Sequence, residues 1–446
     1  MGAKRMIELF DYQQEQVNEA LDYGKMLNFS EVGTGKTYVG LELFKQSQHK
    51  KLLIICLAVK VSDFASDGFK IGLQINPLKG TPKVRKALLE NPSTTQVAIS
   101  FESVWRTPEL LNWVDKDTMI LVDESHKLKS RGSKVAYFAE QLSERSGLVY
   151  LMTASPITNG HYEDYYQQLK IAKIWEDDWK EFKNQFIIEE LASMKLKGGK
   201  ERRFWDIVGY KNIEKLNELV YQSSVAKKRD IDNDLIPEDI FIETKLPTMY
   251  KKLLNDRVVQ LDDGSINEID STSKMFNSLH QLCSGVLKGI SKVMNKDKLN
   301  RLYQIIEENE NENIVLFYNY DSELKSIKDF LKTKKIPISE YNGHKKDLSN
   351  YKNKNGTVAL VHYKSGATGL NDFIKSKICI FYSSPDSSTT YIQAKGRLNR
   401  HGQTRKPVYY HFICKGSVEH KLFYENVLEG KDLTDSIISE IVNSEY

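Results

Sequence analysis

The sequence has few of the features that build cross-linked, metal-stapled or membrane-spanning proteins. Its four cysteines lie far apart with no Cys-x-x-Cys pair, which argues against a zinc ribbon or a disulfide framework. The longest apolar run, residues 52–59, is too short to cross a bilayer, and the first ten residues lack the apolar stretch of a signal peptide. These absences predict a cytoplasmic protein with buried, reduced thiols. The abundance of Lys, Asn and Ile favours a bacterial cell, with a phage-encoded gene as a further option.

Neither positive nor negative charge dominates the sequence. The 64 basic and 60 acidic residues leave a net charge of +4, which permits a polyanionic partner without identifying one. Hydrophobic residues make up 40% of the chain, enough for packed cores. A chain of 446 residues exceeds one ordinary core, so two or three domains are expected.

Short apolar runs alternate with helical patterns in both halves of the chain. The runs are typical of parallel strands buried on both faces, which predicts an α/β fold. They are residues 52–57, 96–100, 119–122 and 147–152 in the first half, and 314–318, 358–362, 378–382 and 408–413 in the second. Between them, residues 162–222 indicate polar helices rich in aromatics. The predicted organisation is a first lobe at 1–160, a helical insertion with a basic linker at 161–230, and a second lobe at 231–446.

A phosphate-binding loop is indicated at residues 30–37, Ser-Glu-Val-Gly-Thr-Gly-Lys-Thr, between a short apolar stretch and a helical pattern. Gly33 and Gly35 would let backbone N–H groups face phosphates, Lys36 would reach the β- and γ-phosphates, and Thr37 would bind Mg²⁺. Ser30 stands where the strict pattern has glycine. Taken alone, the segment could be a glycine-rich turn before a helix.

A second motif follows the apolar run 119–122. Asp123 and Glu124 come at the carboxyl end of this predicted strand, where ligands bind in open α/β sheets. Asp123 would hold Mg²⁺ and Glu124 would activate the attacking water. The alternative, a solvated acidic turn, loses weight because a phosphate loop precedes it. Together the two motifs predict nucleotide hydrolysis.

The complete set of motifs resembles the superfamily-two helicases, and most closely their SWI/SNF-type branch, including small bacterial, phage and annealing-helicase-like members. The resemblance rests on the Asp-Glu-Ser-His box at 123–126, Thr-Ala-Ser-Pro-Ile-Thr-Asn at 153–159, the glycine-rich segment 365–371 and the arginine-bearing segment 393–403. A basic run at 226–230 followed by Leu-Ile-Pro, and Lys298-Leu299 before a helix, are similar to that branch's linker and second lobe.

The resemblance implies two RecA-like lobes that close on ATP and assigns further residues. Gln13 would read adenine, Arg397 would sense the γ-phosphate, Gln393 would support the same cleft, and Arg400 would act as an arginine finger. The expected nucleotide-binding residues are Gln13, Ser30, Glu31, Val32, Gly33, Thr34, Gly35, Lys36, Thr37 and Gly369. An isolated arginine would more often be a surface ion pair; the Arg-x-x-Arg spacing inside this motif favours the functional role.

Nucleic-acid contacts of such a motor should go to phosphates, because a motor ignores base sequence. The candidates by motif position are Lys60, Ser100, Phe101, Lys364, Ser365 and Thr368. The aromatics Trp175, Trp179, Phe182 and Phe186 have helical spacing, which favours packing over base stacking. The glycine-broken basic run 195–203 is expected to be a loop.

The predicted function is an ATP- and Mg²⁺-dependent translocase on double-stranded DNA, favoured over RNA, with a protein loading partner as an option. A strand-separating helicase, or the motor of a restriction or repair complex, stays open as an alternative. A non-catalytic DNA-binding scaffold is disfavoured because Lys36, Asp123, Glu124 and Arg400 are intact.

Overall fold

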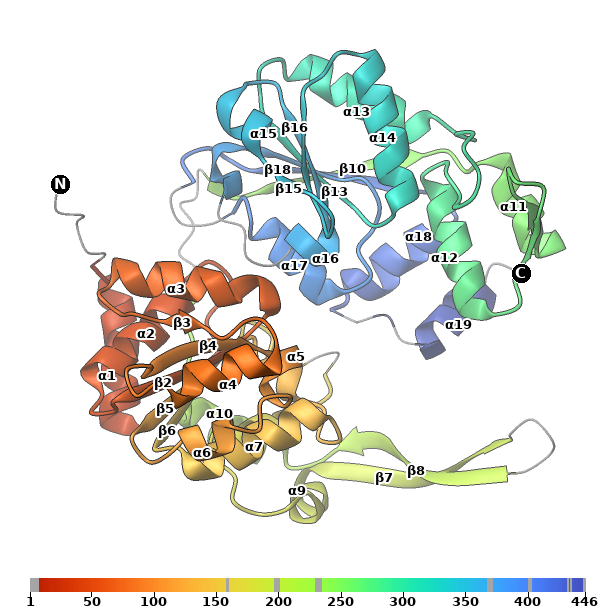
Figure 1. Cartoon of the computed structure of the whole chain (residues 1–446). Helices are drawn as coiled ribbons and strands as arrows, with labels where there is room; N and C mark the ends of the chain where they lie inside the picture. Colours follow the sequence, from red (N-terminus) through yellow and green to blue (C-terminus); the bar gives the residue numbers. More distant parts are fainter. Residues whose placement is uncertain are drawn as a thin grey trace. The chain divides into compact units, whose positions relative to one another are not determined.

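Two units make up the chain, Met1–Arg229 and Asp230–Tyr446, each with its own hydrophobic cores (Figure 1). The computed structural model describes residues 8–157, 160–195, 201–228, 235–366, 372–399, 403–430, 433 and 435–443. Within these ranges, no helix is long and apolar enough to cross a membrane. All four cysteines are buried free thiols.

The first unit is built on a parallel sheet of seven strands in the order β3-β4-β2-β5-β6-β1-β9. Every apolar run predicted to be a strand in this half forms one, because a strand covered on both faces needs apolar side chains at successive positions. The strands are β1 (Leu27–Asn28), β2 (Lys51–Cys56), β3 (Asn76–Pro77), β4 (Gln96–Ser100), β5 (Thr118–Asp123), β6 (Leu148–Met152) and β9 (Ser224–Val225).

Helices cover both faces of this sheet. Leu52, Ile54 and Cys56 of β2 pack in one core with α1 to α3, whereas Leu53 and Ile55 pack in another with α5 to α8, as the two-residue side-chain period of a strand requires. The helices are α1 (Asp11–Tyr23), α2 (Lys36–Gln46), α3 (Val61–Lys70), α4 (Pro82–Glu90), α5 (Phe101–Val104), α6 (Leu110–Trp113), α7 (Lys134–Arg145) and α8 (Asp164–Ile171), with 3-10 turns η1 (Ala58–Lys60) and η2 (Ser125–Leu128).

The insertion differs from the helical expectation. Helices α9 (Trp179–Phe186) and α10 (Ile213–Gln222) are present, but the segment between them is an antiparallel pair, β7 (Ile187–Lys195) and β8 (Glu201–Tyr210). The strand formers of residues 201–210 pair with the helix-favouring β7 sequence, and this cross-strand pairing overrides local propensity. The expected loop at 195–203 therefore includes strand residues, while 196–200 lie outside the described ranges.

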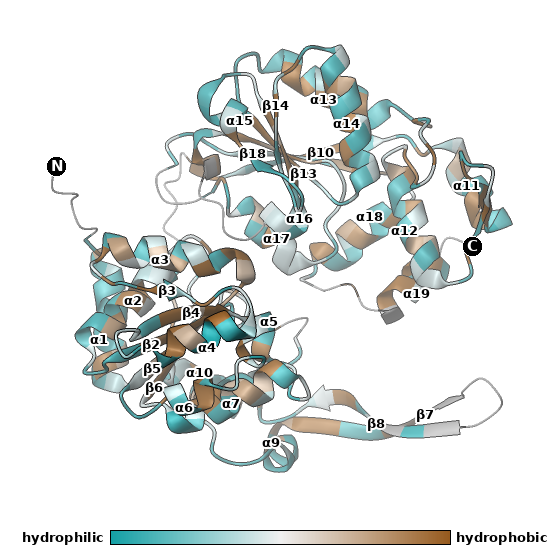
Figure 2. Ribbon diagram, in the orientation of Figure 1, coloured by the Kyte–Doolittle hydropathy of each residue, from teal (hydrophilic) through white to brown (hydrophobic). Residues whose placement is uncertain are grey.

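The second unit contains another seven-stranded sheet, in the order β10-β18-β17-β13-β16-β14-β15, with only β15 antiparallel to its neighbour. Figure 2 shows the central strands of the sheet as hydrophobic. The strands are β10 (Glu238–Thr244), β13 (Ile314–Tyr318), β14 (Ile338–Tyr341), β15 (Lys346–Asp347), β16 (Val358–His362), β17 (Ile378–Phe381) and β18 (Val408–Cys414), with β11 (Val258–Gln260) and β12 (Ile266–Glu268) as a separate hairpin. The predicted fold of two parallel α/β lobes is confirmed.

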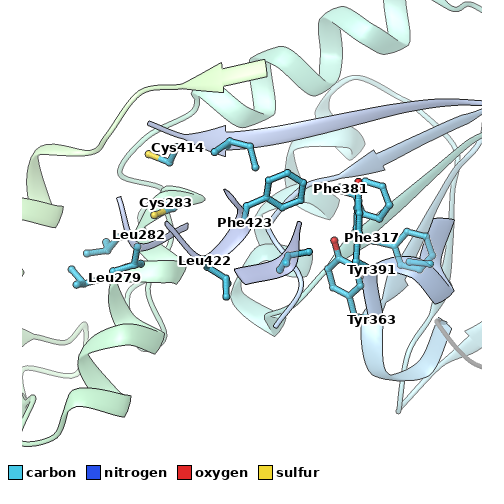
Figure 3. Packing of buried hydrophobic residues seen from close by; sticks show 14 of the residues in the cluster. Leu279, Leu282, Cys283, Phe317, Tyr363, Phe381, Tyr391, Cys414, Leu422 and Phe423 are labelled. Atoms are coloured by element: carbon cyan, nitrogen blue, oxygen red, sulfur yellow. The ribbon is translucent and has the colours of Figure 1, made fainter. Parts of the chain in front are cut away.

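The larger core of this unit lies beneath β13, β17 and β18, where Phe317, Phe381 and Tyr391 pack with Phe423 (Figure 3). Its helices are α11 (Thr248–Asp256), α12 (Thr272–Cys283), α16 (Tyr363–Gly366), α17 (Ser388–Lys395), α18 (Val418–Lys421) and α19 (Asp435–Asn443), with the π-helical turn η5 (Leu422–Val427) and the 3-10 turn η4 (Asp372–Lys375). The other face is covered by α13 (Asp297–Glu308) and α14 (Asp321–Thr333), and α15 (Ser349–Asn353) follows β15.

A buried ion pair sits inside the second unit. The Lys298 ammonium donates to the Glu419 carboxylate at 2.7 Å and to the Tyr382 carbonyl at 2.8 Å, and both charged side chains are at most 2% exposed. Burial alone would raise the pKa of Glu419, but the charges and hydrogen bonds of Lys298 and His280 together outweigh burial and lower this pKa to about 2. Lys298, which the sequence marked only as a family resemblance, therefore neutralises a carboxylate in the core.

Candidate ATP-binding site

The phosphate loop runs from the end of β1 into the first turn of α2. Gly33 and Gly35 have φ angles of 87° and 78°, a left-handed backbone that glycine adopts without strain. A Cβ atom on Gly35 would lie 2.2 Å from the side-chain nitrogen of Gln13, so the loop also needs glycine for space. The N–H groups at the start of a helix suit an anion, and this loop leads directly into one.

Lys36 folds back over the loop. Its ammonium donates to the carbonyl oxygens of Ser30 at 2.7 Å and Glu31 at 3.0 Å. Burial lowers the pKa of Lys36, while the negative charges of Glu124 and then Asp123 oppose this shift. Lys36 and the two carboxylates are therefore close enough to interact electrostatically, which joins the phosphate loop and the acidic box in one site.

Gln13 is held against the phosphate loop at the start of α1. Its side-chain nitrogen donates to the Thr34 carbonyl at 3.0 Å, and its oxygen accepts from the Phe10 N–H at 3.0 Å. The Tyr12 hydroxyl donates to the same Thr34 carbonyl at 2.8 Å. Because each amide atom can make a second hydrogen bond, Gln13 keeps the capacity to bind a nucleotide base.

Ser30, the residue that departs from the glycine pattern, is fully buried and structural. Its hydroxyl accepts from the Gln16 amide at 2.9 Å and from the Lys227 N–H at 3.0 Å, and its own N–H donates to Asn28. A glycine would lose the two hydroxyl bonds. The substitution therefore fastens the loop to the segment after β9. Among the remaining predicted loop residues, Glu31 is exposed, and Val32 and Thr37 are half-buried.

The acidic box stands at the carboxyl end of β5. Asp123 is the last residue of the strand, and burial, then the charge of Glu124, raises its pKa above the usual range. Glu124 adopts a left-handed backbone with φ of 61°, which is uncommon for a side chain of this size. Outliers of this kind gather at functional sites.

His126 connects the acidic box to the next motif. Its Nδ1 atom lies 2.9 Å from the Thr153 hydroxyl and 3.3 Å from a Glu124 carboxylate oxygen. Thr153, fully buried after β6, also accepts from the Ser155 N–H at 3.1 Å. The motif that began at Thr153 thus contacts the acidic box through side chains, while residues 158–159 of that motif lie outside the described ranges.

Gln168 of α8 is a site residue that the sequence did not reveal. Its side-chain oxygen accepts from the Ser125 hydroxyl at 2.8 Å, and its nitrogen donates to the Pro156 carbonyl at 2.6 Å and to the Asp164 carbonyl at 3.0 Å. Ser125 and Gln168 are both fully buried. One amide therefore ties the acidic box to the following motif. No local pattern marks such a residue, because its partners lie far away in the sequence.

The predicted catalytic residues of the second unit are partly described. Gln393 lies on α17 and is half-buried; Arg397 follows that helix and is 8% exposed. Arg400 and Gly369 lie outside the described residues. The roles assigned to these four residues stay predictions.

The predicted nucleic-acid contacts differ in what they can offer. Lys60 is half-buried at the end of η1, and its charge also opposes the raised pKa of Asp123. The Phe101 ring belongs to the hydrophobic core and the Ser100 side chain is buried, so their contacts would come from the backbone. Lys364 is exposed and Ser365 half-buried on α16, whereas Thr368 lies outside the described residues.

The aromatics of the insertion form a packed cluster, as their spacing predicts. Trp175, Phe182 and Phe186 are at most 9% exposed and meet edge to face or tilted, with centroids 4.9–5.7 Å apart, and Trp179 stacks on Phe182. Within the described part of the chain, no group of three His, Cys, Asp or Glu side chains could hold a metal by itself. A cation at Asp123 would therefore need further ligands, such as a hydroxyl, a phosphate or water.

Comparisons with known proteins agree with the motifs. Residues 297–402 match the helicase conserved C-terminal domain. A Drosophila melanogaster protein, SWI/SNF-related matrix-associated actin-dependent regulator of chromatin subfamily A-like protein 1, is 22% identical over 432 residues, which cover 93% of this chain and 53% of that protein. The uncharacterized ATP-dependent helicase YqhH of Bacillus subtilis is 24% identical over 462 residues, covering 94% of this chain and 77% of its own.

Among solved structures, the Sulfolobus solfataricus SWI2/SNF2 ATPase core in complex with dsDNA aligns with 99% of this chain and 96% of its own, at 19% identity and a TM-score of 0.45. The chain spans about half the length of the Drosophila relative. The ordered motifs, the helicase C-terminal domain and these relatives agree with one another. The chain is similar to SWI/SNF-type helicase-like ATPases over most of its length and contains a helicase conserved C-terminal domain.

Proposed function

We propose that this chain is an ATP-hydrolysing motor that moves on double-stranded DNA. The observation that carries the proposal is the electrostatic proximity of Lys36 to Glu124 and Asp123, beside a glycine loop at a helix N-terminus. Phosphate-binding cation, metal-binding carboxylate and candidate base then belong to one site, as hydrolysis of a nucleoside triphosphate requires. The name of the Bacillus relative, an ATP-dependent helicase, supports the same nucleotide.

The residues of the phosphate loop fit ATP. Backbone N–H groups from Gly33 to Thr37 would receive the phosphates, and the Lys36 ammonium would neutralise part of their charge. Gln13, next to the loop, would hydrogen-bond the adenine edge as the resemblance implies. The Gly35 position supports this fit, because a side chain there would collide with the Gln13 amide beside the loop.

Mg²⁺ fits the oxygen donors of the site. The Thr37 hydroxyl, in the first turn of α2, and the Asp123 carboxylate, at the end of β5, are hard ligands of the kind that this ion prefers. When bound, Mg²⁺ would screen the negative charge of the phosphates. The cation would also favour the ionised form of Asp123, opposing the effect of burial on its pKa.

Glu124 is the proposed base. Its left-handed backbone turns the residue out of the strand direction, and His126, 3.3 Å away, restrains the carboxylate. The carboxylate would accept a proton from the attacking water as the oxygen approaches the γ-phosphorus. The Thr153 hydroxyl contacts the same Nδ1 atom of His126, so movement in the Thr153 motif would shift the base.

Duplex DNA is the proposed track. The SWI/SNF-type linker and final motif support it, and the name of the Drosophila relative, a regulator of chromatin, is in keeping with it. Exposed Lys364 and half-buried Lys60 would contact phosphates without reading base sequence. Affinity should then fall steeply with salt, because each neutralised phosphate releases a counterion.

The test compares ATP turnover with duplex DNA, single-stranded DNA and RNA at matched nucleotide concentrations. Duplex DNA should stimulate hydrolysis most, and an unstimulated rate with all three would refute the proposal. A strand-displacement assay on the same preparation separates translocation from unwinding. Displacement of a plain annealed strand would favour the strand-separating alternative.

A further inference from the structure

Strand β10 carries three carboxylates that form ion pairs with lysines. Two of the lysines, Lys406 and Lys415, flank β18, the strand that pairs with β10 along its whole length. The third, Lys395, is the last residue of helix α17, and its partner is Asp239. Of these three carboxylates, Asp239 is therefore the one that connects the sheet to the helix that carries Gln393.

The Asp239 carboxylate contacts α17 at two places. Its two oxygens accept from the Lys395 ammonium, at 2.7 and 2.8 Å. Tyr391 lies one turn earlier on the same face of the helix. Burial raises the pKa of the Tyr391 hydroxyl, and the charge of Asp239 and a hydrogen bond to its carboxylate add to this shift. The Tyr409 hydroxyl donates to the Lys395 carbonyl at 2.7 Å, so the end of the helix is also tied to β18.

Asp239 is itself held by a buried histidine of β18. The Nε2 atom of His411 lies 2.8 Å from an Asp239 oxygen. The His411 ring is stacked between Phe241 and Phe381, its register partners on β10 and β17, with a centroid distance of 4.8 Å to each. Burial lowers the pKa of His411 although the charge of Asp239 opposes this shift, so the ring is neutral near pH 7. Nε2 is then the nitrogen that carries the proton and donates it to the carboxylate.

The burial of His411 has a cost that an apolar residue would avoid. Its Nδ1 atom is buried and has no hydrogen-bond partner in the described part of the chain, which destabilises the fold. In return, the histidine provides a rigid donor for Asp239. The hydrogen bonds of His411 and Lys395 outweigh the effect of burial and lower the pKa of Asp239, so the carboxylate stays ionised.

The helical geometry of α17 relates this contact to the predicted catalytic residues. Gln393 lies midway between Tyr391 and Lys395 in the sequence, and residues two apart point to different sides of a helix. The face that contacts Asp239 is therefore not the face that bears Gln393. Arg397, which is 8% exposed, follows Lys395 by two residues. A shift of the anchored face would change the directions of both predicted catalytic side chains.

We propose that Asp239 is a positioning residue for ATP hydrolysis. It fixes α17, through Lys395 and Tyr391, in the orientation that the two predicted catalytic side chains of this segment require. The inference rests on the proposed ATPase and adds a residue that lies outside its motifs. Asp239 touches no substrate in this role, so its loss should lower kcat and leave nucleotide binding unchanged.

The experiment measures ATP turnover of the full chain with saturating duplex DNA, and separately the affinity for a fluorescent ATP analogue. Asp239→Asn keeps the shape of the side chain and removes its charge. This variant should lower kcat by about 10- to 100-fold, the range expected when a catalytic group moves by about 1 Å, and leave KM and analogue affinity unchanged. Lys395→Met should have the same effect, whereas Lys395→Arg should retain most of the turnover, because a guanidinium also pairs with a carboxylate. The double variant Asp239→Asn, Lys395→Met should lose no more than the weaker of the two single variants, since both changes break one link.

Glu243→Gln is the matched control, because Glu243 lies on the same strand and pairs through both oxygens with Lys415, a lysine outside α17. Its kcat should equal that of the wild-type chain. A wild-type kcat for Asp239→Asn would overturn the inference. A loss of turnover that accompanies partial unfolding in circular dichroism, and that recovers on cooling, would overturn it as well, because a purely structural ion pair would explain that result. If the wild-type chain hydrolysed no ATP, the proposed function itself would fail.

Discussion

Replacing Gln168 with leucine should damage catalysis more than it damages folding. The leucine side chain has about the same volume as that of glutamine, but it lacks the amide that joins Ser125 to Pro156. The Ser125 hydroxyl loses its acceptor and the Pro156 carbonyl loses its donor, whereas the Asp164 carbonyl keeps the helix backbone as a partner. The acidic box and the Thr153 motif would then no longer be held in a fixed position relative to each other.

The size of both effects follows from burial. A buried polar group left without a partner costs about 1–3 kcal/mol, so two such groups should lower the free energy of unfolding by about 2–4 kcal/mol after some rotation of the Ser125 hydroxyl. A shift of about 1 Å in a catalytic group can reduce the rate by about 10²-fold. We therefore expect kcat to fall by about 10- to 100-fold. The KM for ATP should change little, because the hydrogen bonds of Gln168 go to Ser125, Pro156 and Asp164 and not to the phosphate loop.

Gln167→Leu is the control on the same helix. Gln167 is 1% exposed, its nitrogen donates to Glu140 at 2.8 Å, and its oxygen is buried without a hydrogen-bond partner. The Gln167→Leu substitution should lower the free energy of unfolding by about 1 kcal/mol or less and leave kcat unchanged. Steady-state ATP turnover with duplex DNA, measured where circular dichroism finds both variants folded, decides between them. Equal kcat values for the two variants would refute the positioning role of Gln168. Ser125→Ala added to Gln168→Leu should cost little more, since both changes break one link.

Three further predictions concern single residues. Glu124→Gln should retain nucleotide binding and lose about 10²- to 10⁴-fold in turnover, as a missing base would, and a near-normal rate would remove Glu124 from that role. Gly35→Ala should weaken binding of a fluorescent ATP analogue at least about tenfold. A methyl group at this left-handed position would lie 2.2 Å from the buried side-chain nitrogen of Gln13. Gly24→Ala is the control and should bind normally, because Gly24 is also left-handed but has open space around it. Because the folded-state pKa of Glu419 is lowered to about 2, its stabilising effect is complete above about pH 4.5 and is lost as pH falls toward 2. Lys298→Met should destabilise the second unit by about 3–5 kcal/mol and move this acid transition to higher pH, and an unshifted transition in denaturation followed by circular dichroism would contradict the ion-pair argument.

The sequence predicted the sheets well because buried parallel strands have a strong local signal. The run 314–318 became β13 and the run 358–362 became β16 without a change of bounds, and each is covered on both faces. Edge strands have a weaker signal. Residues 238–244, with alternating exposure, form β10 only because β18 pairs with them along their full length.

The antiparallel pair of β7 and β8 could not be predicted for a related reason. Residues 187–195 contain Glu, Leu, Ala, Met and Lys, which favour helix when read alone. Their strand conformation depends on residues 201–210, whose aromatic and β-branched side chains pair with them. Propensity over a short window cannot include that partner. The glycines between the two segments were therefore interpreted as a break in a loop.

In the candidate site too, the sequence reveals residues in local motifs but not residues that act through contacts between distant segments. Lys36, Asp123 and Glu124 were found because family motifs keep fixed spacing along the chain. Gln16 and Gln168, which hold Ser30 and Ser125, were missed because each acts through a contact between separate segments. A motif identifies the residues that do chemistry, whereas the residues that orient them depend on the packing of whichever helix lies alongside.

The pairing of β9 with β1 decides where the first unit can be cut from the chain. The Leu27 and Phe29 N–H groups donate to the Ser223 and Val225 carbonyls, and the Glu31 N–H donates to Lys227. The last strand before the second unit is thus an edge of the sheet that carries the phosphate loop. A fragment ending at residue 222 would leave that loop without its neighbour, so a first unit produced alone for nucleotide-binding studies must continue through Lys227.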